Sequence, residues 1–504
     1  MWKVIIVIVS FTVFTACNKF LDKMPSKSSS LVVATTDQLS SLLSNYSNFY
    51  KESNTYYTWS SDDNGLSKDL YDARPATFKL NAIQATLWDT DNLPTDTYTE
   101  SSWGEEYKKI FYANEVFDNL DRVTGSQVDK DNLKAEAHFI RAYSYFNLVN
   151  TYCLPYNEAN KNAQGLPMKT SVSFEQSGVR ASLSKVYEFI ESDLQEALKL
   201  KTKLVRDGAV KHWRGSTAGV NAFAARYYLQ MNNYTEALKY AELSLAEYNI
   251  LVDYNTEMRY GKDDVFTIDA GTSQSKKVTV KYPYTHDDQL GMADRFGWKE
   301  FLYFRILYNT SEWYIPSQAL LDLYDKTNDL RYKYHMVQGF SYKRGFLKPS
   351  YNYSGYIFFY NDGIPSGPTT AEMYLIKAEC LARLNRIPEA MVAVNELHSK
   401  RMLTGAPSLT ATNKAQAIQV ILEERRREMP FTKRMLDLRR FNNNEDANDD
   451  VVVNRLFYPY NSVTVETDKA PITYTLEKKS SKYAYPIPKA DIESSQGEIE
   501  QNKY

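Results

Sequence analysis

The stretch MNNYTEAL (residues 231–238) aligns with a second stretch of the same chain, LNRIPEAM (residues 384–391). Each follows an alanine-rich helical pattern, places an asparagine in a turn, and starts a second helix close to Glu-Ala. This order is typical of tetratricopeptide repeats. One such hairpin cannot bury its apolar face alone, so several must stack. The two stretches therefore predict a scaffold of stacked tetratricopeptide-like helix hairpins.

Apolar side chains recur at helical spacing on both sides of these stretches, so we expect a mostly α fold. The helix hairpins are expected near residues 105–150, 184–248 and 371–440. Eight side chains within them are predicted to be buried between helices: Tyr227, Tyr228, Ala237, Leu238, Leu375, Ala378, Leu381 and Ala390.

Long stretches without helical periodicity separate the hairpins, mainly near residues 51–103 and 249–368, with another at 441–487. Loops of this length in a compact protein are usually functional or disordered. The chain contains 40 Tyr, 23 Phe and 7 Trp, and this aromatic content argues against disorder. We expect the inserts to pack together on one side of the helices as an irregular second layer. Two short stretches, 278–280 and 463–465, alternate like strands.

The N-terminus carries an uncharged run, Val4 to Ala16, that follows Lys3 and leads directly into Cys17. The run is too short to span a bilayer, and its order of charge, apolar core and small residues is that of a secretory signal. Residues 14–17 (FTAC) resemble a bacterial lipobox, in which the cysteine is lipidated and becomes the first mature residue. We therefore predict a signal peptide at residues 1–16 and lipidation at Cys17. The alternative is an ordinary signal sequence with a chance cysteine.

Composition and motifs argue against several classes of function. The net charge of −2 argues against a nucleic-acid partner. The other two cysteines, Cys153 and Cys380, are expected to be buried free thiols. The sequence has no zinc-protease, nucleophile-elbow or phosphate-loop motif, and its five histidines lack metal-ligand spacing. We expect no enzyme activity, no cofactor and no metal; a weak calcium-loop likeness at residues 60–65 is interpreted as a plain turn.

Basic residues on the predicted helices are interpreted as structural. Arg425 to Arg427 are bracketed by glutamates, as in a salt-bridged helix. Arg141 lies on the helix that contains residues 132–149 and is expected to cap neighbouring backbone. Neither is expected to contact a ligand.

A series of blocks, in order along nearly the whole chain, resembles the SusD/RagB nutrient-uptake outer-membrane lipoproteins of Bacteroidetes. The blocks are 17–22 (CNKFLD), 59–63 (WSSDD), 135–149 (AEAHFIRAYSYFNLV), 315–324 (IPSQALLDLY), 371–379 (AEMYLIKAE), 424–428 (ERRRE) with 436–440 (LDLRR), 485–488 (YPIP) and 501–504 (QNKY). Two departures affect local turns: Tyr152-Cys153 replaces the family's usual Tyr-Gly, and Thr432-Lys433 replaces an acidic-Gly pair.

This resemblance implies one SusD-like domain over residues 17–504, anchored by lipid to the outer membrane and facing the exterior. It also implies a non-catalytic role: capture of an oligosaccharide for a TonB-dependent SusC-like transporter, with a peptide-type ligand as the alternative. Two other functions compete with it. A lipid-anchored hydrolase would need a catalytic constellation, and paired carboxylates for such chemistry are spaced in the fold rather than in the sequence. A general tetratricopeptide scaffold for protein assembly would share the helices but not the aromatic inserts.

Ligand contacts are predicted in the aromatic inserts, because loops on a rigid scaffold commonly carry recognition. The candidates combine rings with nearby polar groups: Asp72, Arg74, Trp88, Trp298, Tyr303, Trp313 and Tyr314. Trp88 and Trp298 rank first because a flat ring can stack on the C–H face of a sugar. The opposing interpretation is that such tryptophans belong to the core or to the transporter interface.

Overall fold

The structure, a computed structural model, describes residues 33–504 with several internal gaps. The gaps are residues 54, 74, 76–77, 94–101, 174, 270–274, 285–291, 309–313, 338–353 and 360–362. Three of the predicted site residues, Cys17, Arg74 and Trp313, lie outside the described residues.

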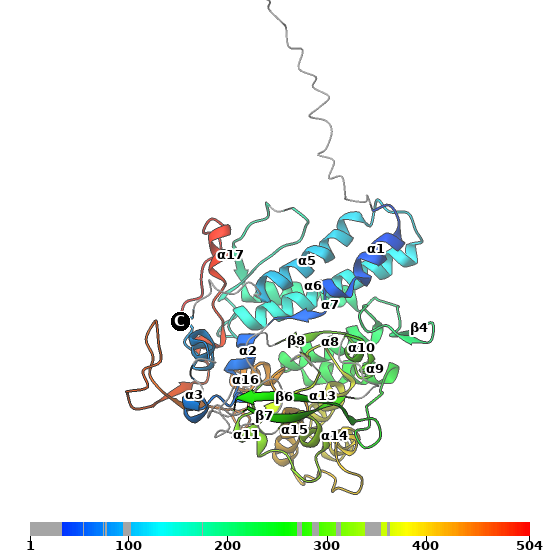
Figure 1. Ribbon diagram of the computed structural model, residues 1–504. Helices are drawn as coiled ribbons and strands as arrows, with labels where there is room; N and C mark the ends of the chain where they lie inside the picture. Colours follow the sequence, from blue (N-terminus) through cyan, green and yellow to red (C-terminus); the bar gives the residue numbers. More distant parts are fainter. Residues whose placement is uncertain are drawn as a thin grey trace, which may run out of the picture.

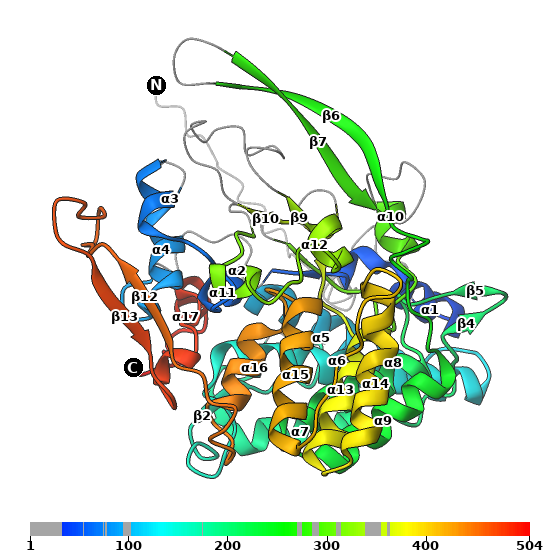
Figure 2. The same ribbon diagram turned by 90° about the horizontal axis from the view of Figure 1, so that it is seen from below.

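Helices stack side by side to form the main body of the molecule (Figure 2). They are α5 (Ser102–Asn119), α6 (Gln127–Tyr152), α7 (Leu183–Ala197), α8 (Thr217–Gln230), α9 (Tyr234–Glu247), α13 (Thr370–Arg383), α14 (Ile387–Arg401), α15 (Lys414–Glu428) and α16 (Arg434–Phe441). Helix α6 packs against α5 and α7, α9 packs against α8 and α13, and α13 packs against α14 and α15. The mostly α architecture of stacked helix hairpins predicted from the sequence is therefore confirmed.

The two aligned stretches form the same turn. Asn232 follows α8 and Asn385 follows α13, with φ of 56° and 63° respectively. In each turn the N–H two residues after the helix cap donates back to a carbonyl of the last turn, from Asn233 to Tyr228 (2.9 Å) and from Arg386 to Leu381 (2.8 Å). This is a Schellman motif, whose left-handed position accepts asparagine readily. The repeated asparagine is therefore the residue at which one helix ends and the chain turns into the next helix.

All eight side chains predicted to lie between helices are buried, with at most 9% of their surface exposed. Cys153 and Cys380 are buried free thiols, as predicted. Small residues such as Ala237, Ala378 and Ala390 lie at the helix contacts, where they allow the backbones to approach closely. The alanine-rich patterns of the sequence thus mark the positions at which neighbouring helices contact one another.

The basic residues of α15 (Lys414–Glu428) form buried ion pairs, both with a neighbouring helix and within α15 itself. Arg425 Nε donates to Asp437 of α16 at 2.8 Å, and Arg427 Nη2 lies 2.8 Å from Glu424 on its own helix. The structural interpretation of the basic run is confirmed. Arg141 is structural too, but its partners correct the prediction: it binds Asp193 of α7 through side chains, at 2.7 Å, rather than capping backbone.

The N-terminal part of the second layer contains short helices. These are α1 (Thr36–Ser44), α2 (Thr55–Ser60), α3 (Lys68–Ala73) and α4 (Leu80–Thr86). Helix α1 packs on α5 and α6, and α2 contacts α4 and α16. The 3₁₀ turn Tyr46–Asn48 leads into the first short strand.

Strands and further short helices make up the insert between α9 and α13. They are β6 (Arg259–Asp269), β7 (Ser275–Tyr284), α10 (Met292–Gly297), β8 (Ile306–Tyr308), α11 (Gln318–Leu321), α12 (Leu330–His335), β9 (Met336–Val337), β10 (Gly355–Tyr356) and β11 (Gly363–Pro365). The N-terminal insert adds the short strand β1 (Lys51–Glu52). Strand β8 joins β1 in parallel and β11 in antiparallel, and β6 pairs with β7 in a long hairpin. Figure 2 shows β6–β7, β9, β10 and α12 on one side of the helical stack.

The remaining elements are small hairpins and the C-terminal segment. They are β2 (Gln164–Pro167) with β3 (Arg180–Ser182), β4 (Val205–Arg206) with β5 (Ala209–Val210), β12 (Val453–Phe457) with β13 (Ile472–Leu476), the 3₁₀ turn Ser481–Tyr483, and α17 (Lys489–Ser494). The strand predicted at residues 278–280 lies in β7. The one predicted at 463–465 is wrong, because these residues lie in the loop between β12 and β13. Val465 makes a single β-bridge to Tyr460 there, and Asn461 Oδ1 accepts the backbone N–H groups of Val463 and Thr464.

In the part of the chain that the structure describes, no helix is both long and apolar enough to cross a bilayer.

A buried histidine makes the fold sensitive to acid. Both ring nitrogens of His335 are bonded, Nδ1 to the Ile357 carbonyl (2.9 Å) and Nε2 to the Tyr254 hydroxyl (3.0 Å), and burial lowers its pKa to about 4. An unfolded histidine titrates near pH 6.5, so its contribution to stability is complete above that pH and is lost as the pH falls towards 4, by about 3 kcal/mol. In urea unfolding at pH 7 and pH 4.5, His335→Gln should lose less stability than the natural chain. An equal loss in both proteins would contradict this assignment.

Candidate functional site

The aromatic residues predicted to bind ligand are buried. Trp88, Trp298, Tyr303 and Tyr314 each expose only 1–3% of their surface. They belong to three separate clusters of the core, Trp88 and Tyr303 to the largest one and the other two to clusters in the insert layer. The structure therefore does not gather these rings around one open cavity, and their burial favours the opposing interpretation, that they are core residues.

Each of these rings has a structural partner. Trp88 has a positive φ of 57°, donates from Nε1 to the Ser60 carbonyl at 2.9 Å, and carries the Arg455 guanidinium 5.3 Å from its ring. The Trp298 ring meets Phe358 edge-on at 4.7 Å. The space beside Trp298 is about 30 Å³, which is room for a water molecule but not for a sugar ring.

The acidic candidates are engaged by other residues. Asp72 is exposed, binds Lys68 Nζ at 2.6 Å and accepts a hydrogen bond from the Tyr458 hydroxyl at 3.1 Å. In the turn at residues 60–65, Asp62 binds Arg434 at 2.7 Å and Asp63 binds Arg426 at 2.7 Å. Arginine therefore occupies the carboxylates that resembled a calcium loop.

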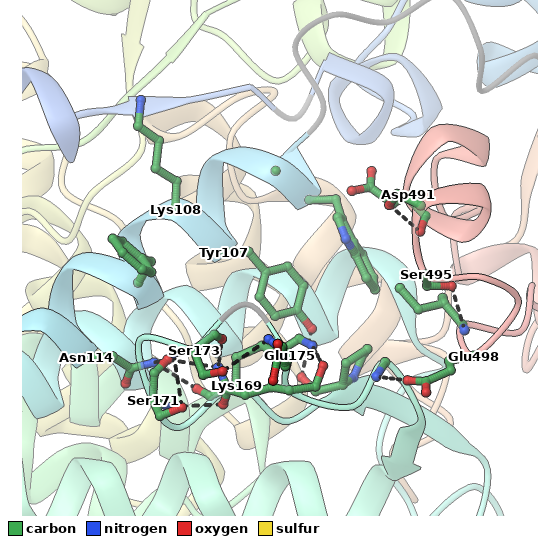
Figure 3. Close-up of a pocket in the computed structure, with 18 of the residues that line it drawn as sticks. Tyr107, Lys108, Asn114, Lys169, Ser171, Ser173, Glu175, Asp491, Ser495 and Glu498 are labelled. Carbon is green, nitrogen blue, oxygen red and sulfur yellow. Dashed lines mark hydrogen bonds between the residues drawn. The ribbon is translucent and has the colours of Figure 1, made fainter. Parts of the chain in front are cut away.

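An open groove of about 720 Å³ lies elsewhere, at one end of the helical stack. We call it the α5 groove. Its walls are one face of α5, the loop between β2 and β3, and the C-terminal segment around α17 (Figures 1 and 3). Its main lining residues are Trp103, Tyr107, Phe111, Asn114, Lys169, Ser171, Ser173, Glu175, Asp491, Ser495 and Glu498.

Aromatic rings follow the α5 wall at intervals of one helical turn. Trp103, Tyr107 and Phe111 are four residues apart, which places successive side chains about 6 Å apart along the helix. Trp103 is buried as part of the floor, whereas Tyr107 and Phe111 are partly exposed. The Tyr107 hydroxyl donates to the Pro167 carbonyl at 2.9 Å, which fixes the orientation of its ring. This wall is a preformed aromatic surface.

Hydrogen bonds fix the loop wall to α5. Asn114 Nδ2 donates to the carbonyls of Lys169 and Ser171, both at 3.1 Å. Gln176 Nε2 donates back to Ser171 O at 2.8 Å, and Lys169 Nζ donates to the carbonyl of Gln176 at 2.6 Å. Figure 3 shows Asn114, Lys169 and Ser171 below Tyr107. The loop is thus held by side chains from the helix and from within itself.

The third wall contributes carboxylates. Glu498 accepts hydrogen bonds from the Gly178 backbone and from the Ser177 hydroxyl, which links the C-terminal segment to the loop. The carboxylate of Asp491, on α17, has no hydrogen-bond or ionic partner among the residues that the structure describes, and partial burial raises its pKa. Nothing in the described regions places three or more His, Cys, Asp or Glu side chains together for a metal ion. The groove therefore offers flat apolar rings on one side and hydrogen-bond acceptors on the other.

Sequence reasoning missed this groove. The spacing of Trp103, Tyr107 and Phe111 was available as a signal, but Phe111 reads equally well as part of an inward apolar stripe. The two other walls come from residues about 60 and 390 positions further along the chain. No local pattern relates such distant segments.

Comparison with known proteins identifies a consistent group of relatives. Residues 19–229 match the SusD-like_3 family, described as starch-binding and associating with the outer membrane, and residues 370–504 match the SusD family. None of the curated protein sequences matches the chain.

Solved structures resemble nearly the whole chain in fold. A SusD superfamily protein from Bacteroides thetaiotaomicron has a TM-score of 0.64 at 17% identity, covering 94% of this chain and 100% of that one. Surface glycan-binding protein A from Bacteroides uniformis has a TM-score of 0.60 at 14% identity, covering 93% and 99%. A laminarin-binding SusD-like protein has a TM-score of 0.58 at 18% identity, covering 94% and 99%.

Proposed function

Because the chain belongs to the SusD family, we propose that it is a cell-surface binding protein that captures an oligosaccharide and delivers it to a TonB-dependent SusC-like transporter. We further propose the α5 groove as a place where the oligosaccharide is held. The protein is proposed to be held at the outer membrane through lipid on Cys17, facing the exterior.

The α5 groove is the observation that carries the proposed binding activity. A sugar ring is amphipathic: its C–H face packs on an aromatic ring, and its hydroxyls at the edge need hydrogen-bond partners. The groove meets both needs, with Tyr107 and Phe111 on α5 and with carboxylates and serines on the other walls. Its walls are fixed by internal hydrogen bonds, so little conformational entropy is lost when ligand binds.

An oligosaccharide fits the groove better than a peptide does. Peptide recognition commonly uses an unpaired strand edge or a deep apolar pocket. The walls of the α5 groove are two helices and a loop that side chains hold in place, so among the described residues they present no strand edge to a peptide. Carboxylates are among the lining groups. Two of the structural relatives are named as glycan-binding and laminarin-binding proteins, which also supports this choice.

Replacing Phe111 with alanine is expected to weaken oligosaccharide binding about tenfold, because ring stacking contributes roughly 1–3 kcal/mol per ring by analogy with nucleic-acid bases. Isothermal titration calorimetry with a panel of neutral oligosaccharides measures the change. Phe117→Ala is the matched control: Phe117 is also a partly exposed phenylalanine on α5, but its ring packs on His138 at 4.5 Å instead of lining the groove. Equal affinities for the two variants would place binding outside the groove.

Recovery of a large outer-membrane barrel together with the native protein would test the transporter partnership directly. A tetratricopeptide scaffold for other assemblies would instead be recovered with soluble partners and without a barrel.

A further inference from the structure

We propose that the α5 groove selects uncharged glycan chains over anionic ones, and that Asp491 is the side chain that discriminates between them. This inference rests on the proposed function and adds the chemical class of the ligand. It concerns chains that carry uronic acids or sulfate groups, as against chains built from neutral sugars.

The described lining of the groove carries two lysines and three carboxylates. Lys169 is committed to the carbonyls of Gln176 (2.6 Å) and Ser177 (2.8 Å), so its ammonium is already satisfied within the loop. Lys108 also lines the groove; it is exposed, and in Figure 3 its side chain extends away from Asp491. The carboxylates of Glu175 and Asp491, in contrast, have no hydrogen-bond or ionic partner among the described residues. An anionic group seated beside Asp491 would therefore meet a carboxylate that no cation of the described residues neutralises.

Asp491 is placed where this charge has the largest effect. It lies on α17 with its side chain directed towards α5, opposite the wall that carries the aromatic rings (Figure 3). It is partly buried, and the resulting desolvation raises its pKa. Coulomb repulsion between like charges is stronger in such a partly desolvated site than in open water.

A neutral sugar can replace the water that the Asp491 carboxylate has lost through partial burial. Hydroxyl groups that donate to a carboxylate form short, charge-assisted hydrogen bonds, which are about twice as strong as neutral ones. A sugar stacked on Phe111 or Tyr107 would turn its edge, where the hydroxyls lie, towards the α17 wall. The two rings are about 6 Å apart along α5, close to the length of one sugar unit in an extended chain. Asp491 would thus be bonded by hydroxyls of a neutral chain and would repel a carboxylate or sulfate in the same place.

The test compares a neutral laminari-oligosaccharide with an oligogalacturonate of equal length, titrated into the natural protein, Asp491→Asn and Glu493→Gln. The natural protein should bind the neutral chain at least tenfold more tightly. Asp491→Asn should weaken binding of the neutral oligosaccharide. It should also reduce the preference for that chain, the ratio of its affinity to that of the oligogalacturonate, by about tenfold. Glu493→Gln, an exposed acid on the same short helix that does not line the groove, should leave the ratio unchanged.

Three results would overturn the inference. Equal or tighter binding of the oligogalacturonate by the natural protein would show that the groove does not reject anions. Neutral binding that is unaffected by both Asp491→Asn and Phe111→Ala would place it outside the groove, while leaving the capture function standing. Failure of the natural protein to bind any oligosaccharide of a wider neutral panel would remove the inference together with the proposed function.

Discussion

Cys17→Ala is expected to release the protein from the outer membrane almost completely. One acyl chain gives only marginal, reversible membrane binding, and two or more give stable anchoring. The cysteine of a bacterial lipoprotein carries three such chains, so its loss removes the whole anchor at once. Within the described residues, no helix is available to replace it as a membrane span.

Membrane fractionation followed by immunodetection measures this release. Cys153→Ala is the matched control, because that thiol is buried at the end of α6 and should not affect attachment. Far-UV circular dichroism of the released Cys17→Ala protein should be unchanged, since the helical stack lies downstream of the anchor. Mass spectrometry that found a mature N-terminus at another residue, without lipid, would rule out the assignment.

The helical scaffold was predictable because its signals are local. The spacing of apolar and alanine residues gives the helices, and the asparagine after α8 and after α13 marks the turns through the left-handed conformation it tolerates. Partner choice was harder to predict. Arg141 reaches Asp193 on the next helix, and a sequence alone does not say which carboxylate will lie opposite a buried guanidinium.

The candidate site was not predictable to the same extent, because aromatic composition does not report burial. The insert layer has its own apolar clusters, which include Trp298 in one and Tyr314 in another. An irregular layer without regular backbone pairing needs large side chains to fill its interior. Many of the aromatic residues of the inserts are therefore core residues rather than ligand contacts. The α5 groove, in contrast, uses a helix that the sequence marked only as scaffold.

Trp298→Ala is expected to lower the free energy of unfolding by about 3–5 kcal/mol, the usual cost of removing a buried tryptophan side chain. The ring contacts Phe358, Phe359 and Tyr254, with ring centroids 4.7, 6.1 and 6.4 Å away. Its removal would leave a cavity among side chains that belong to the core of the insert layer. Urea unfolding measures the change.

Two comparisons make this test decisive between a core residue and a ligand platform. Trp298→Phe keeps an aromatic ring and should cost less than the alanine variant, whereas Leu243→Ala, on the exposed face of α9, should change stability by less than about 0.5 kcal/mol. If Trp298 instead stacks on ligand, its alanine variant would keep nearly full stability and lose affinity for oligosaccharide. Because 97% of its surface is covered in the absence of ligand, that result would require the insert layer to open before a sugar could reach the ring. Stability loss with unchanged affinity is the outcome that the packing around Trp298 predicts.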